Sequence, residues 1–156
     1  MKTEILTLIA IFAVGTAFAE IQSQEVSVKL GPKKFLDGDV VRIDSVRSTS
    51  PKLEVGDQVT VTGMYRLDSQ PAAKLALYLT QIESDGIEET DAGQIVSAKR
   101  GWHEFTASIT IKHRGHLHLT FYDDSTGTPF GGVYFGTPEQ VDVAMAVSLD
   151  HYPTER

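Results

Sequence analysis

Two histidines separated by one residue are the first candidates for chemistry in this sequence. His116 and His118 belong to an alternating segment, residues 116–122, so a strand would carry both imidazoles on one face. Imidazole nitrogens bind metal ions, but a metal site needs a third and a fourth ligand. The chain offers three side chains for those positions: His113, Asp123 and His151. Because Asp123 lies five residues after His118 and His151 lies near the chain end, neither is a firm ligand, and the sequence favours two exposed histidines without a metal.

Aromatic and basic side chains accompany the histidines in the alternating segments. If the leucines of residues 74–80 and 116–122 face a core, Tyr78 and Tyr122 face outward on the same side as the histidines. The same alternation turns Arg66 outward from residues 58–67. It also turns Tyr134 outward, between Val133 and Phe135. If their strands belong to one sheet, a shallow groove brings five of these side chains together: Arg66, Tyr78, His116, His118 and Tyr122. Tyr134 is expected near one end of that surface.

Such a groove is suited to a sugar. The C–H face of a pyranose stacks on an aromatic ring, and its hydroxyls pair with polar side chains such as arginine or histidine. Contacts of this kind need no catalytic group. The alternative interpretation is that Tyr78 and Tyr122 are ordinary cross-strand neighbours on an exposed sheet face.

Two further positions have both a binding and a structural interpretation. Trp102, the only tryptophan, is either a ligand platform or a packing residue at the edge of the fold. Residues 123–129 form a polar loop that begins with Asp123 and Asp124. Calcium requires several oxygen ligands, which two adjacent aspartates do not specify, so a solvated turn is favoured over a structural calcium site.

Established catalytic patterns are missing from the sequence. It contains no cysteine, which excludes a thiol nucleophile, thiolate-bound zinc and disulfides. Glycoside hydrolysis needs two carboxylates held across the scissile bond, whereas most of the acidic residues fall in expected loops, five of them within residues 83–91. Nucleophile-elbow, zinc-protease, phosphate-loop and dinucleotide motifs do not occur. We therefore expect a protein that is not an enzyme and uses no cofactor.

The first residues predict export. Residues 1–19 combine Lys2, an apolar run of about 15 residues and the closing triplet Ala17-Phe18-Ala19, as in a secretory signal peptide. A membrane anchor is the alternative, but the run is shorter than the roughly 20 residues that span a bilayer. Residues 20–156 then form a single domain, secreted or periplasmic. The net charge of −7 argues against nucleic acid as a partner.

Alternating hydropathy predicts an all-β domain. We expect nine strands, at residues 25–30, 40–46, 58–67, 74–80, 94–98, 102–112, 116–122, 132–135 and 141–149. Turn residues separate them, for example Ser69-Gln70-Pro71. Residues 72–82 could alternatively be helical, but their β-branched and aromatic neighbours favour a strand. Short strands at this spacing predict a two-sheet antiparallel sandwich.

The order of features between Leu53 and Leu149 resembles the carbohydrate-binding modules of the family 4/9 type. A Val55-Gly56-Asp57 turn precedes a strand, Trp102 and Phe105 have a W-x-x-F spacing, and Asp142-Val143 stands where a terminal strand begins. The resemblance implies a galactose-binding-like jelly roll that binds a polysaccharide or oligosaccharide. Binding faces in that family often use asparagine, of which this chain has none.

Three functions follow from these patterns. The first is an exported, non-catalytic module that binds carbohydrate or another extracellular polymer on one sheet face. The second is a structural or protein-interaction module of the cell envelope, with the same fold and no sugar site. The third is a small cupin-like metal-dependent enzyme built on His116 and His118.

Overall fold

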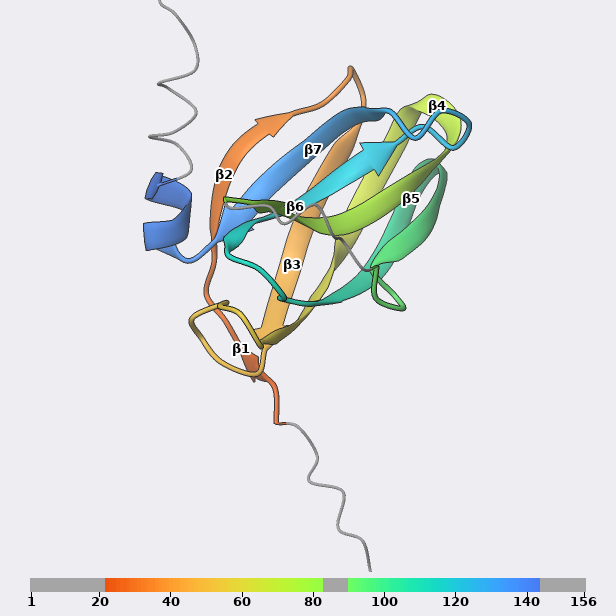
Figure 1. The fold of residues 1–156 in the computed structure, drawn as a ribbon. Helices are drawn as coiled ribbons and strands as arrows, with labels where there is room; N and C mark the ends of the chain where they lie inside the picture. The colour runs from red at the N-terminus through yellow and green to blue at the C-terminus, as the bar shows by residue number, and fades with distance from the viewer. Residues whose placement is uncertain (1–21, 83–89, 144–156) are drawn as a thin grey trace, which may run out of the picture.

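The computed structural model describes residues 22–82 and 90–143, which fold into a curled antiparallel sheet (Figure 1). The predicted signal peptide, residues 1–19, lies outside the described residues. Seven strands make up the sheet: β1 Gln24–Glu25, β2 Lys29–Lys34, β3 Val40–Ser48, β4 Gln58–Gln81, β5 Ile95–Thr110, β6 Gly115–Tyr122 and β7 Pro129–Gly136. Their order is β1-β3-β4-β6-β7-β2, with β5 paired to β4, and every pairing is antiparallel. The prediction of an all-β, antiparallel fold is confirmed.

A long bent hairpin, β4 and β5, organises this sheet. β4 has 24 residues; its first half pairs with β3 and its second half with β6, while β5 follows it along both halves. The register shifts between Leu67 and Ala72, where β4 bulges. The predicted turn at Ser69-Gln70-Pro71 is therefore wrong, because the chain continues as strand there. Pro71 is tolerated at this bulge, where a strand needs no ladder hydrogen bond from its nitrogen.

The same continuity merges the two strands predicted at residues 94–98 and 102–112 into β5. Gly101, with a φ of 99°, takes a left-handed conformation opposite the β4 bulge, which lets β5 follow the bend. The described strands thus form one hydrogen-bonded sheet that curls over its own inner face. The two-sheet jelly-roll arrangement is not confirmed.

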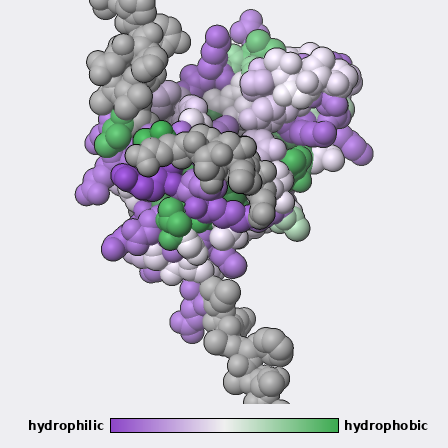
Figure 2. All heavy atoms as spheres, viewed as in Figure 1, coloured by the Kyte–Doolittle hydropathy of each residue, from purple (hydrophilic) through white to green (hydrophobic). Residues whose placement is uncertain are grey.

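Alternation places the core on the inner face of the curl, as the sequence predicts. The predicted core residues of the segments 58–67, 74–80 and 116–122 are all buried: Val59, Val61, Tyr65, Leu67, Leu75, Leu77, Leu79, Leu117, Leu119 and Phe121. Phe121 packs edge-on against Tyr65 and face to face with Phe130, so the two halves of the curl share one core. On the surface drawn in Figure 2, apolar residues form small patches separated by hydrophilic ones.

The last predicted strand, residues 141–149, is wrong where it can be compared, because residues 138–143 are helical; the remainder lies outside the described residues. Local sequence explains the helix. The Thr137 hydroxyl accepts from the Gln140 amide (3.3 Å), and Gln140 Oε1 accepts from the Thr137 amide (3.0 Å), which is a capping box. Pro138 occupies the first helical position, which favours proline. The helix lies beside β2 (Figure 1).

The helical alternative for residues 72–82 is also excluded, because nearly all of that segment belongs to β4. Among the described residues, no helix is both long enough and apolar enough to cross a bilayer.

Candidate functional site

Three predicted site residues form a row across the outer face of β4, β6 and β7. Tyr78 is the register partner of His118, and His118 is the partner of Tyr134. The ring centroids of Tyr78 and His118 lie 6.3 Å apart, and those of His118 and Tyr134 lie 5.2 Å apart. The three strands are neighbours in the sheet. On each of them, alternation turns the aromatic ring outward and the adjacent leucines or valines toward the core. The row is thus a direct consequence of the alternating sequence.

Tyr122 extends the row. It lies on the same face of β6 as His118, four residues farther along the strand. Its ring meets Tyr78 edge to face, with centroids 5.6 Å apart and an interplanar angle of 85°. Edge-to-face packing is a preferred geometry for aromatic pairs. Tyr78, His118, Tyr122 and Tyr134 are all partly buried, and they are called the aromatic cluster below. Lys74, the exposed register partner of Tyr122, lies at its edge.

Hydrogen bonds fix two rings of the aromatic cluster. His118 Nδ1 lies 2.7 Å from Thr120 Oγ1, and the Tyr134 hydroxyl lies 3.2 Å from Thr80 Oγ1. Burial lowers the pKa of His118 from 6.5 to about 4, since a charged imidazole would lose its hydration there. At neutral pH the aromatic cluster is therefore an uncharged surface that carries the tyrosine hydroxyls and the imidazole of His118.

Arg66 and Trp102 do not join this cluster. They are register partners of each other, on β4 and β5, and belong to the half of the sheet that contains β3. Arg66 binds Asp68 through an ion pair of 2.5 Å. Arg66 and Tyr78 lie on opposite sides of the β4 bulge, so the single groove expected to contain both is not formed. Trp102 is 52% exposed, which does not fit the expectation that it packs at the edge.

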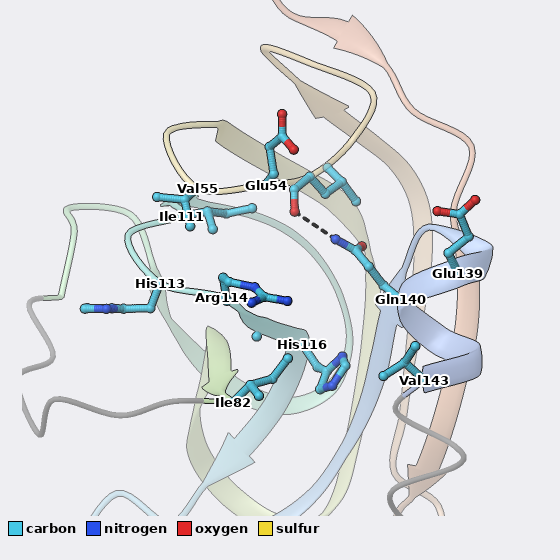
Figure 3. A pocket seen from close by; sticks show the side chains of 12 residues that line it. Glu54, Val55, Ile82, Ile111, His113, Arg114, His116, Glu139, Gln140 and Val143 are labelled. Atoms are coloured by element: carbon cyan, nitrogen blue, oxygen red, sulfur yellow. Dashed lines mark hydrogen bonds between the residues drawn. The ribbon is translucent and has the colours of Figure 1, made fainter.

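His116 also departs from the expected arrangement. It lines a pocket of about 490 Å³ at the end of the sheet where β4 ends and β6 begins (Figure 3). The walls come from the β3–β4 loop, the β5–β6 loop and the helix at residues 138–143. The apolar part of the lining consists of Leu53, Val55, Ile82, Ile111 and Val143. A cavity of this size and character is typical of small-molecule sites.

Few polar groups reach the inside of this pocket. Figure 3 shows Arg114, His116 and Gln140 pointing toward the same space, whereas the carboxylates of Glu54 and Glu139 point away from it. The Gln140 amide is already engaged: its Nε2 donates to the Leu53 carbonyl (2.9 Å) and its Oε1 accepts from a backbone amide. Burial lowers the pKa of His116, which favours the neutral form of this imidazole. Arg114 is thus the one charged group directed inward in this view.

Sequence reasoning did not identify Arg114 as a site residue. Arg114-Gly115 carries the signature of a turn, and a turn is what the chain forms between β5 and β6. The other walls of the pocket lie about 60 residues before and 25 residues after Arg114. Only the curl of the sheet brings them together.

A metal site receives no support from the described residues, among which no group of three or more His, Asp or Glu side chains is placed to hold an ion. His116 lines the pocket while His118 belongs to the aromatic cluster. Asp123, in the loop considered for calcium, uses one carboxylate oxygen to accept from both the amide and the hydroxyl of Ser125 and of Thr126. These bonds lower its pKa to about 2 and shape the turn.

Comparison of the chain with protein-family models, curated proteins and solved structures gives no match.

Proposed function

We propose that this protein is a non-catalytic module that binds a carbohydrate chain, or an extracellular polymer of similar shape, on the outer face of β4, β6 and β7. The observation that carries the proposal is the row of Tyr78, His118 and Tyr134, three rings from three adjacent strands at centroid distances of 6.3 and 5.2 Å. A row of this kind offers an extended ligand several contacts in line. A chain of sugar rings is such a ligand.

The chemistry of the aromatic cluster favours a sugar over a purely apolar ligand. Ring edges and faces provide the apolar contact that a pyranose C–H face requires. The Tyr134 hydroxyl belongs to the same surface, and Lys74 is the exposed register partner of Tyr122, so both can pair with sugar hydroxyls. Since His118 is neutral at pH 7, binding there requires no charge on the ligand.

Two predictions from the sequence agree with this proposal without testing it. The resemblance to carbohydrate-binding modules of the family 4/9 type, with their two-sheet jelly roll, implies the same ligand class. The predicted signal peptide would deliver the protein to the periplasm or the cell exterior, where polysaccharides are found. Both remain part of the proposal.

The proposal is tested by affinity electrophoresis through gels that contain a soluble polysaccharide, with a β-glucan, a xylan and a galactan as separate gels. We expect at least one to retard the wild-type protein. The double variant Tyr78→Ala/Tyr122→Ala should bind that polymer roughly tenfold more weakly or worse, because two packing partners of the sugar are lost. Circular dichroism and the Tm of each variant establish that it is folded.

Trp102→Ala is the matched control, since it removes an exposed aromatic ring from the other half of the sheet. Retardation should survive this change. Equal binding by the wild type and the Tyr78/Tyr122 variant would reject the aromatic cluster as the site. If no polysaccharide retards the protein and a glycan array is also negative, the proposal fails in favour of an envelope protein-interaction module.

A further inference from the structure

The pocket at the end of the sheet concentrates exposed apolar side chains. Val55, Ile82 and Val143 are 52%, 54% and 53% exposed, and all three line it. They come from three segments that are distant in sequence, so their proximity is produced by the fold. Exposed apolar residues grouped on a concave surface often mark a binding site. Beneath them, Leu53 and Ile111 are buried and form an apolar floor.

Arg114 gives this apolar pocket a definite charge preference. In Figure 3 its guanidinium extends into the space between Ile111, His116 and Gln140. Within residues 22–82 and 90–143, no hydrogen bond or ion pair is found for this side chain, although five other ion pairs are. The two acidic residues of the lining, Glu54 and Glu139, point elsewhere. The pocket therefore presents a cation with unused donors next to hydrocarbon.

The remaining polar groups restrict how a ligand head can bind. Gln140 is committed to backbone partners, so it offers no free donor to a ligand. Burial disfavours the charged form of His116, and the neutral imidazole has one ring N–H to donate. A planar guanidinium matches a carboxylate through two parallel hydrogen bonds. A positively charged head would be repelled, and a neutral one would gain only weaker bonds.

From this arrangement we infer that the pocket binds an amphipathic monocarboxylate, a hydrocarbon chain that ends in a carboxylate. The carboxylate pairs with Arg114, with His116 beside it, and the chain lies along Ile82, Val143 and the floor of the pocket. The inference does not depend on the proposed function, because the aromatic cluster and the lining of the pocket have no residue in common. It adds a second ligand of a different chemical class.

Isothermal titration calorimetry with decanoate tests the inference directly. Decanol has a similar chain without charge, and decylammonium reverses the charge of the head. We expect decanoate to bind with a negative heat-capacity change, decanol to bind several-fold more weakly, and decylammonium to bind more weakly still. Equal affinities for decanoate and decanol would overturn the inference, since Arg114 would then contribute nothing.

Variants locate the site. Arg114→Gln, which removes the charge of this exposed side chain, should weaken decanoate binding several-fold, because a solvated guanidinium pairs with a carboxylate less strongly than a buried one. Arg100→Gln is the matched control, because it removes an exposed arginine from the β4–β5 bend, and its affinity should equal that of the wild type. Unchanged binding by Arg114→Gln would refute the proposed head-group site.

A second pair of variants tests the apolar wall without risk to the core. Ile82→Ser changes an exposed residue of the pocket, and Leu36→Ser changes an exposed residue elsewhere. Only the first should lower the affinity for decanoate. The Tyr78→Ala/Tyr122→Ala variant should bind decanoate normally, so a failure of polysaccharide binding leaves this result unaffected. Loss of decanoate binding in that variant alone would move the site to the aromatic cluster and contradict the inference.

Discussion

The Ser69 hydroxyl donates to Asp39 Oδ2 over 2.6 Å, joining two residues that are 30 positions apart at the bulge of β4. The other carboxylate oxygen of Asp39 accepts from the backbone amides of Asp68 and Ser69, at 2.8 and 3.0 Å. The bulge removes these amides from the sheet ladder, and the buried carboxylate replaces the lost partners. Asp39 thus holds the bend that separates the two halves of the outer surface.

Asp39→Ala should therefore lower the free energy of unfolding by roughly 2–3 kcal/mol, because it removes three hydrogen bonds that a buried carboxylate accepts. Urea denaturation measures the change. Asp37→Ala, at an exposed position two residues earlier, is the control and should differ from the wild type by less than about 0.5 kcal/mol. If both variants unfold at the same urea concentration, Asp39 does not stabilise the bulge.

The depressed pKa of His118 predicts a dependence of stability on pH. Burial lowers this pKa to about 4 from 6.5, so between these two pH values the unfolded chain binds more protons than the folded protein. The contribution is fully present above pH 6.5 and is lost as the pH falls toward 4. Its size is on the order of 1–3 kcal/mol, given the shift of the pKa.

His118→Gln should reduce the loss of stability between pH 7.5 and pH 5, as measured by urea unfolding at both pH values. The glutamine keeps a polar group near Thr120 but does not titrate. An NMR titration of the His118 ring in the wild type provides the direct check. A titration midpoint near 6.5 would contradict the burial argument, as would identical pH dependences of the two proteins.

The contrast between β6 and β4 shows which parts of the fold the sequence could predict. In β6, strict alternation determines which side chains face inward, and burial of Leu117, Leu119 and Phe121 confirms that prediction. At Ser69-Gln70-Pro71, local residue types are the same for a turn and for a bulge. The distinguishing interaction comes from Asp39, which no local pattern reveals. The sequence therefore predicts most of the strands, but neither how they are joined nor the helix at residues 138–143.

The aromatic cluster and the pocket differ, for the same reason, in how far the sequence can predict them. Tyr78 and His118 are brought together by alternation plus pairing of adjacent strands, so the aromatic cluster was accessible from the sequence. Alternation alone places Arg66 in the same groove, because no local pattern reveals the bend in β4. The pocket around Arg114 depends on which end of the curl each loop reaches, and this is determined by tertiary contacts alone.

Gln140 connects the helix at residues 138–143 to the β3–β4 loop, and its removal should loosen one wall of the pocket. Its Nε2 donates to the carbonyls of Lys52 and Leu53, at 3.2 and 2.9 Å, and Leu53 has a φ of 53°, which is unusual for a residue other than glycine. These bonds help to hold that strained loop. Gln140→Ala should cost about 1–3 kcal/mol of unfolding free energy.

Gln140→Glu separates the two roles of this side chain. A glutamate keeps the acceptor for the Thr137 amide, so the helix cap survives, but it directs a carboxylate oxygen at the carbonyls of Lys52 and Leu53. At pH 7 we expect it to be at least as destabilising as alanine and to speed hydrogen exchange at Asp57, whose amide donates to the Glu54 carbonyl within the same loop. Glu139→Ala, at the neighbouring exposed position, should leave both readouts unchanged. Wild-type exchange rates in Gln140→Glu would mean that the loop keeps its conformation without the glutamine.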